Sequence, residues 1–144
     1  MIQAAVADRK ENMAEQYTNP LQGLIVDEGE QAIDTRLNEV LRSFLAFTKD
    51  GRIVSKPEFL KLSHPNRILV ALLGRHAMVR LCLPNAALEA APEDLVRDCL
   101  VKLKSCREYL SRMKTQRLLE KNEKGYFVPT WALPNATDAV KKGS

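Results

Sequence analysis

The chain has 144 residues, of which 45% are hydrophobic and 28% charged, as in an ordinary globular protein. This length allows one domain with its own core, or a small domain with an arm. No apolar run approaches the roughly 20 residues needed to cross a bilayer, and the N-terminal stretch lacks the apolar segment of a secretory signal. We therefore expect no membrane partner and a cytoplasmic location.

The net charge of +4 is unevenly distributed along the chain. Residues 1–60 contain seven Lys or Arg and ten Asp or Glu, a balance of −3. Residues 97–124 contain nine Lys or Arg and four acids, a balance of +5. This asymmetry is typical of a protein with one polyanion-binding half. The simpler alternative is a solvated helix face that keeps the protein in solution.

The residues that most often hold metals or act as nucleophiles show no functional spacing. Cys82, Cys99 and Cys106 have no paired C-x-x-C arrangement, and the two histidines are not placed near them as in zinc sites. Cys99 and Cys106 stand at apolar positions and are expected to be small core residues. We therefore expect no metal, no cofactor and no catalytic residue.

The first 50 residues predict a polar arm followed by an amphipathic helix. Residues 1–20 are polar, and a helical period begins at Glu30 and ends near Lys49-Asp50-Gly51. Its apolar stripe comprises Ile33, Leu37, Val40, Leu41, Phe44, Leu45 and Phe47. We interpret the helix around Ile33–Phe47 as a possible homodimer interface. Packing of this helix on its own domain is an equally good reading.

The middle of the chain predicts a buried central helix. Ser63 is a candidate cap, and the stretch from Asn66 to Leu83 is apolar on nearly all sides in its first half. Gly74 within it indicates close packing by another helix. Pro92-Glu93-Asp94 then resembles the first turn of a further helix, with acids at its positive end.

Residues 105–129 change from a helical to a hairpin pattern. Cys106, Leu110 and Met113 are apolar at helical spacing, with basic and polar residues between them. The polar turn of residues 122–125 closes on Gly125 and is followed by Tyr126-Phe127-Val128, which predicts a short β-hairpin with a basic tip.

This succession resembles the second half of a winged helix-turn-helix DNA-binding domain. The resemblance implies a mainly α fold with a small β-hairpin, with a winged-helix-like domain over residues 51–134 after the N-terminal helical region of residues 1–50. Residues 135–144 are expected to be a flexible tail. In this family one face of the recognition helix is buried and the other enters the major groove. The resemblance places DNA contacts at Lys102, Lys104, Ser105, Arg107, Ser111, Arg112 and Lys114 of the helix, and at Lys121 and Lys124 of the wing.

Two positions depart from the family pattern. The turn before the recognition helix normally contains glycine, but residues 100–104 contain neither Gly nor Pro, and Arg117 stands where the family often has glycine. A single continuous helix over residues 92–121 is therefore an alternative. It would carry a heptad seam of Val96, Cys99, Leu103, Cys106, Leu110 and Met113.

Two classes of function follow. The first is a duplex-DNA-binding transcription regulator or accessory factor, favoured by the basic excess. The second is a helical protein–protein interaction module without nucleic-acid contact, favoured by Glu108 in the middle of the proposed reading face, since a carboxylate repels phosphate. An enzyme is the weakest reading.

Overall fold

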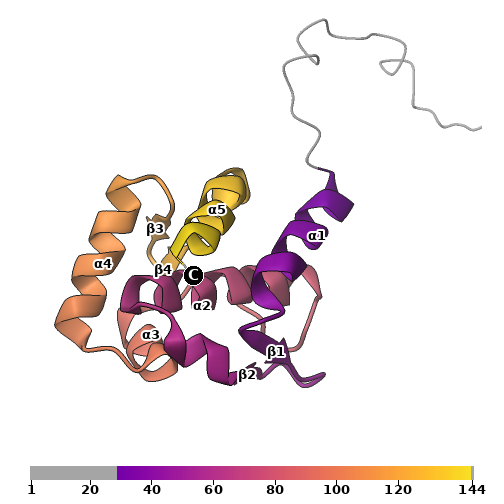
Figure 1. The fold of residues 1–144 in the computed structure, drawn as a ribbon, viewed down its shortest axis with the longest axis horizontal. Helices are drawn as coiled ribbons and strands as arrows, with labels where there is room; N and C mark the ends of the chain where they lie inside the picture. Colours follow the sequence, from indigo (N-terminus) through magenta and orange to yellow (C-terminus); the bar gives the residue numbers. More distant parts are fainter. Residues whose placement is uncertain (1–28, 144) are drawn as a thin grey trace, which may run out of the picture.

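The computed structural model describes residues 29–143, so the predicted polar arm of residues 1–20 lies outside the described residues. The elements, in chain order, are α1 (Glu30–Leu41), β1 (Leu45–Phe47), β2 (Ile53–Ser55), the 3-10 helix η3 (Pro57–Lys61), α2 (His64–Arg80), α3 (Pro92–Cys99), α4 (Leu103–Thr115), β3 (Glu120–Asn122), β4 (Gly125–Phe127), the 3-10 helix η4 (Thr130–Ala132) and α5 (Leu133–Gly143). The fold is mainly helical with two small antiparallel hairpins (Figure 1). The expected fold class, mainly α with a small hairpin, is confirmed.

Helix α2 is the centre of the molecule. Its apolar residues include Ile68, Leu69, Val70, Leu72 and Leu73, all at most 1% exposed. The helix contacts α1, α3, α4, α5 and β4. In Figure 1, α2 lies across the middle, with α4 and the β3–β4 hairpin on one side and α1 and the β1–β2 hairpin on the other. A helix that is apolar all round is stable only when neighbours cover each of its faces.

The predicted first helix is too long. Helix α1 ends at Leu41, and residues 45–47 form β1, which pairs with β2 in the register Leu45↔Ser55, Ala46↔Val54 and Phe47↔Ile53. Leu45 and Phe47 fit a helical stripe and also the alternation of a half-buried strand, so periodicity alone could not separate the two. Gly51 favours the strand over the helix, because its φ of +89° closes a tight turn between β1 and β2. A Cβ at this position would lie 2.0 Å from the Pro84 carbonyl oxygen.

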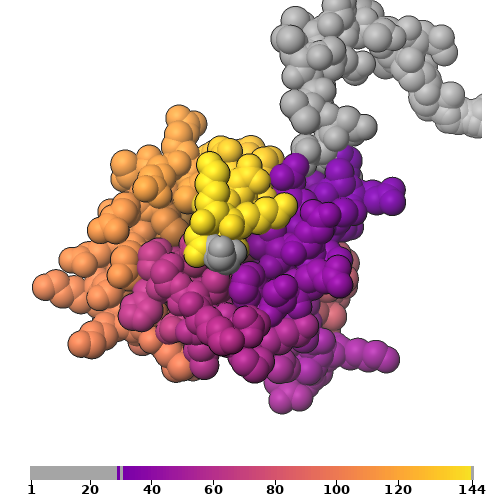
Figure 2. All heavy atoms as spheres, in the orientation of Figure 1, coloured from indigo at the N-terminus to yellow at the C-terminus, as the bar shows by residue number. Residues whose placement is uncertain are grey.

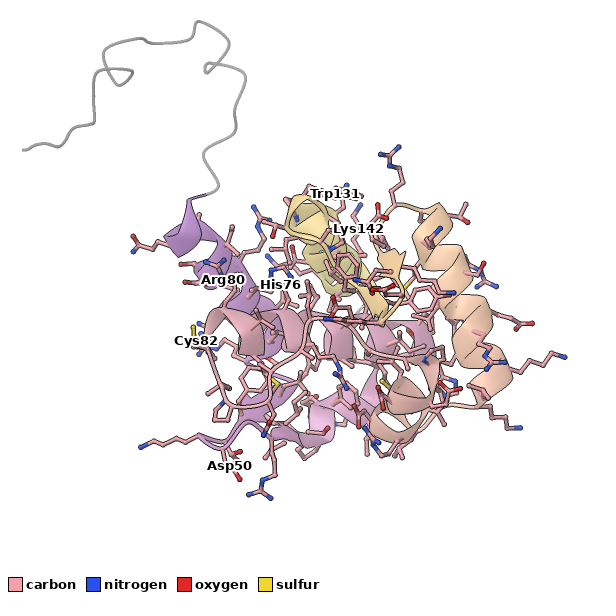
Figure 3. The ribbon with its side chains drawn as sticks, turned by 180° about the vertical axis from the view of Figure 1, so that it is seen from behind. Asp50, His76, Arg80, Cys82, Trp131 and Lys142 are labelled. Atoms are coloured by element: carbon pink, nitrogen blue, oxygen red, sulfur yellow. The ribbon has the colours of Figure 1, made fainter. Side chains whose placement is uncertain are left out.

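Side-chain hydrogen bonds stabilise this turn. The Thr48 hydroxyl donates to the Asp50 carboxylate and thereby lowers the pKa of Asp50, which stands at the hairpin tip (Figure 3). The Arg52 guanidinium lies 3.1 Å from the same carboxylate. These local polar contacts favour a hairpin over continuation of α1.

The apolar stripe of α1 is buried within the single chain. Ile33, Leu37, Val40 and Leu41 are 3–7% exposed, and α1 contacts α2 and α5. The stripe that was interpreted as a dimer interface is therefore part of the intramolecular core. The described part of residues 29–50 and the predicted domain of residues 51–134 share one buried cluster, which extends from Ile33 to Val140.

The prediction of a flexible tail from residue 135 is wrong. Helix α5 continues to Gly143 and packs on α2 and α1, with Ala136, Thr137 and Val140 at most 1% exposed. In Figure 2, α5 lies on the surface between α1 and the α4–hairpin segment. This helix was not predicted from the sequence because its buried face is made mainly of small residues, which give a weak apolar periodicity.

The segment from 92 to 121 contains two helices, so the continuous-helix alternative is wrong. Helix α3 ends at Cys99, and Leu100 has left-handed backbone angles, φ +57° and ψ +49°. Val101 turns into the core and is 6% exposed. Arg117 also has a positive φ, +64°. Both positions at which the sequence departs from the family pattern therefore adopt the backbone conformation that glycine favours.

We predict that Leu100→Gly stabilises the protein by about 1 kcal/mol, because the left-handed conformation costs a branched residue about 1–2 kcal/mol and Leu100 is 66% exposed. Leu81→Gly is the matched control, since Leu81 also ends a helix and is 60% exposed but has a φ of −80°. It should lose about 1 kcal/mol. Urea unfolding of both variants measures the difference, and equal destabilisation would contradict the left-handed turn.

Candidate nucleic-acid interface

Helix α4 presents a polar face to solvent. Its buried residues, Cys106, Leu110 and Met113, follow i, i+4, i+7 spacing and are at most 5% exposed. The same spacing places Lys104, Glu108, Ser111 and Thr115 together on the opposite side, and all four are exposed. In Figure 2, side chains of the α4 segment project from one edge of the molecule.

The predicted contact residues lie on α4, on its N-cap or on the second hairpin. Lys102 is the N-cap residue of α4, and Ser105 is half-buried. The others are all exposed: Lys102, Lys104, Arg107, Ser111, Arg112, Lys114, Lys121 and Lys124. The Arg112 guanidinium lies over the Tyr109 ring, 5.7 Å from its centre, which supports the arginine along the helix surface.

Asn122 shapes the tip of the second hairpin. Its Oδ1 accepts hydrogen bonds from the backbone amides of Lys124 at 2.8 Å and Gly125 at 3.2 Å, while its Nδ2 donates to Glu89 at 3.0 Å. The bond from Asn122 lowers the pKa of the Glu89 carboxyl. These contacts hold Lys121 and Lys124 on an ordered turn.

A backbone bridge attaches this hairpin to the start of α3. Ala90 and Tyr126 exchange two hydrogen bonds of 2.9 Å, each amide donating to the other residue's carbonyl. A Cβ at Gly125 would lie 2.4 Å from the Ala90 carbonyl oxygen, so glycine is required for this approach. The bridge fixes the hairpin relative to α3. A one-residue bridge has no periodicity, so it could not be predicted from the sequence.

The helix and the hairpin meet at a surface hollow of about 440 Å³. Arg107 of α4 lines it together with Lys121, Lys124 and Tyr126 of the hairpin and Pro92 of α3. The structure thus brings together three of the predicted contact residues. Arg107 also pairs with Glu93 at 3.4 Å, while Lys121 lies 5.4 Å from the centre of the Tyr126 ring.

Most cations of this region have no intramolecular counterion. Of the nine Lys and Arg between residues 97 and 124, Arg97 and Arg107 form ion pairs. The remaining seven form none within the described part of the chain: Lys102, Lys104, Arg112, Lys114, Arg117, Lys121 and Lys124. Unpaired surface cations on one side of a protein create a positive potential that attracts polyanions.

Two arginines of α2 hold α3 in place, and sequence reasoning did not assign this role. Arg67 donates to the carbonyls of Leu60, Leu62 and Cys99, at 2.6, 3.2 and 3.3 Å respectively. Arg75 donates to the Glu89 carbonyl at 3.2 Å and lies 3.4 Å from Asp98. The sequence signal for this role is that Arg67 and Arg75 interrupt a largely apolar helix and, being eight residues apart, lie on neighbouring faces.

Arg80, the last residue of α2, is engaged within the molecule. Its guanidinium binds the carboxylate of Asp34 on α1, and in Figure 3 it lies beside that helix, at the opposite end of the molecule from α4. In the same view, Trp131 lies at the outer edge, and its ring centre is 5.9 Å from the Arg117 guanidinium. Trp131 is 53% exposed.

Two of the three cysteines, Cys99 and Cys106, are buried in environments that suppress thiolate chemistry. Burial raises the pKa of Cys99 to about 12, and burial also raises the pKa of Cys106. A thiol that remains protonated is a poor nucleophile and a poor metal ligand. Within residues 29–143, no three His, Cys, Asp or Glu side chains are grouped as metal ligands would be.

Comparison with protein families, with curated proteins and with solved structures gave no match for this chain. None of the helices in the described region combines the length and apolar character needed to span a bilayer.

His76 connects the central helix to the base of the second hairpin. It is 5% exposed, and its Nδ1 donates a hydrogen bond of 2.8 Å to the Val128 carbonyl. Burial lowers the pKa of His76 below its ordinary value of 6.5, and the nearby Arg80 acts in the same direction. The folded protein therefore favours the neutral imidazole.

We predict that His76 makes folding pH-dependent below about pH 7. Below pH 6.5, His76 becomes protonated in the unfolded chain but stays neutral in the folded protein. The free energy of unfolding therefore falls as the pH drops towards the folded-state pKa, by at most about 1.4 kcal/mol per pH unit. Urea unfolding at several pH values measures this slope. His76→Asn, which preserves a donor, should flatten it, whereas His64→Asn, at an exposed position, should leave it unchanged. Equal slopes in all three proteins would assign the pH dependence to other groups.

Proposed function

We propose that the segment from α2 to α5 is a winged helix-turn-helix domain that binds duplex DNA, in a transcription regulator or an accessory DNA-binding factor. Helix α4 would be the recognition helix and the β3–β4 hairpin the wing. The observation that carries the proposal is the set of seven exposed cations without an ion pair on α4, its flanks and the hairpin. Phosphate contacts by such cations supply most of the non-specific affinity of DNA-binding proteins.

The dimensions of α4 suit the major groove. Its 13 residues extend about 20 Å, and the major groove of B-form DNA, about 12 Å wide, admits an α-helix. Lys104 and Ser111, on the outward face, would approach base edges, and Arg107 and Arg112 would flank them. Arginine recognises guanine edges and phosphates through its planar fork.

The hairpin supplies a second point of contact. Lys124 is at its tip and Lys121 on β3, and both are exposed on a turn that Asn122 fixes. An ordered wing loses less conformational freedom on binding than a loose loop would. Arg107 lies in the hollow between the two elements, where a phosphate could be shared between helix and wing.

Glu108 supports the second candidate function, a protein–protein interaction module. It lies among Lys104, Ser111 and Thr115 on the outward face, where its charge would repel a phosphate backbone. The exposed Trp131 is also of the residue type enriched in protein interfaces. Seven unpaired cations outweigh the three exposed acids of the same segment that form no ion pair within the described residues, Glu108, Glu120 and Glu123, which places DNA binding first.

We predict binding to random-sequence duplex DNA that weakens steeply with salt. Fluorescence anisotropy at several salt concentrations gives the slope of log affinity against log salt, and each phosphate contact contributes about 0.9 to it. Lys104→Gln and Lys124→Gln should each reduce the slope by about that amount. Glu108→Gln should strengthen binding at low salt.

Lys49→Gln is the matched control, because Lys49 is equally exposed but stands on the turn between β1 and β2. It changes the net charge by the same amount and should leave the slope unchanged. If the wild-type protein binds no duplex at low salt, the interaction-module function replaces the proposal. If Lys49→Gln and Lys124→Gln reduce the slope equally, the contact is a diffuse charge effect and not a built interface.

A further inference from the structure

A second hollow, of about 380 Å³, lies between the β1–β2 hairpin, η3, α2 and α3. None of its lining residues belongs to α4 or to the β3–β4 hairpin. Its apolar wall includes Ile53, Phe59, Ala71 and Met78. This volume is at the lower end of the range that small-molecule sites occupy, about 300–1,000 Å³.

Arg75 supplies a positive charge to this hollow, and its hydrogen bonds are incomplete. Its side chain is 18% exposed, and its two partners, the Glu89 carbonyl and the Asp98 carboxylate, lie at 3.2 and 3.4 Å. Its Nε is buried and has no hydrogen-bond partner among the described residues. A buried donor without a partner is costly, so a shift of the guanidinium toward an acceptor that a ligand supplies would be favourable.

Asp98 need not lose its counterion when a ligand binds Arg75. The Asp98 carboxylate also accepts a hydrogen bond of 3.3 Å from Arg97 Nε. An incoming anion could therefore take over an Arg75 donor while Asp98 stays paired with Arg97. Asp98 is the single acid in the lining, against the cations Arg52 and Arg75, and Arg52 is itself paired with Asp50 outside the lining.

Two further polar groups of the lining are available. The side chains of Ser55 and Asn85 make no hydrogen bond to the part of the chain that the structure describes. A site with an apolar wall and a few convergent polar groups around a cation is typical of a binding pocket for small molecules.

We propose that this hollow binds a small organic carboxylate with an apolar body. The carboxylate accepts hydrogen bonds from the Arg75 guanidinium, the geometry for which arginine is best suited. Ser55 and Asn85 provide the remaining polar contacts, and the apolar body packs against Ile53, Phe59 and Met78. This site is separate from the proposed DNA contacts and does not depend on them.

The test uses benzoate and hexanoate as probes, with benzamide and hexanamide as neutral controls of the same shape. NMR titration of the labelled full chain, without DNA, follows the Arg75 Nε–Hε signal and the methyl groups of Ile53 and Met78. We expect saturable shifts of all three groups with at least one carboxylate, and binding of its amide at least about tenfold weaker, as for the loss of a charge-assisted hydrogen bond. The absence of saturable shifts with both carboxylates, or equal binding of acid and amide, would overturn the proposal.

Two variants locate the site. Arg75→Gln should weaken carboxylate binding at least about tenfold. Because Arg75 also supports the segment before α3, Ala71→Leu provides an independent probe: it fills the hollow without changing its charge and should abolish the methyl shifts. Lys61→Gln, which removes an exposed cation outside the lining, is the matched control and should bind as the wild type does. Wild-type affinity in a folded Ala71→Leu protein would place the carboxylate elsewhere.

Discussion

The position of α4 depends on the hydrogen bonds that Arg67 makes from the first turns of α2. Its guanidinium binds three backbone carbonyls, those of Leu60 and Leu62 around the end of η3 and that of Cys99 at the end of α3. The last carbonyls of a helix have no partner within it, and a cation there satisfies both their hydrogen bonding and the helix dipole. Arg67 thus fixes the end of α3 against the central helix, and the left-handed Leu100 directs the chain from that point into α4.

The arrangement of the basic residues follows from this scaffold. Arg75 holds the segment before α3, and the bridge between Ala90 and Tyr126 attaches the second hairpin to the same segment. Helix α4 buries its Cys106, Leu110 and Met113 face, so the intervening lysines and arginines can only project outwards. The unpaired charge of α4 and the hairpin is therefore carried on elements that the core holds rigidly, as recognition of a regular polyanion requires.

Helix α4 and the second hairpin were predicted from the sequence better than the other elements, for physical reasons. The period of Cys106, Leu110 and Met113 and the polar turn closed by Gly125 are local signals, and the structure confirms both elements. The predicted end of α1 was wrong because Leu45 and Phe47 fit a helical and a strand period equally well. Helix α5, the Ala90 bridge and the carbonyl contacts of Arg67 depend on partners distant in sequence. The exposure of the candidate residues on α4 could be predicted from the helical spacing of its apolar residues. That Arg107 lies in one hollow with Lys121 and Lys124 could be seen only in the folded structure.

The proposed contact of duplex DNA with α4 and the second hairpin can be tested by a map of perturbed backbone amides. Two-dimensional NMR spectra of the labelled chain, recorded with and without a random-sequence duplex at low salt, locate the contact residue by residue. We expect the largest shifts on residues 102–115 and 120–126, while α1 and the β1–β2 hairpin remain unchanged. Shifts centred on α1 or the first hairpin, or a spectrum unchanged by DNA, would rule this contact out.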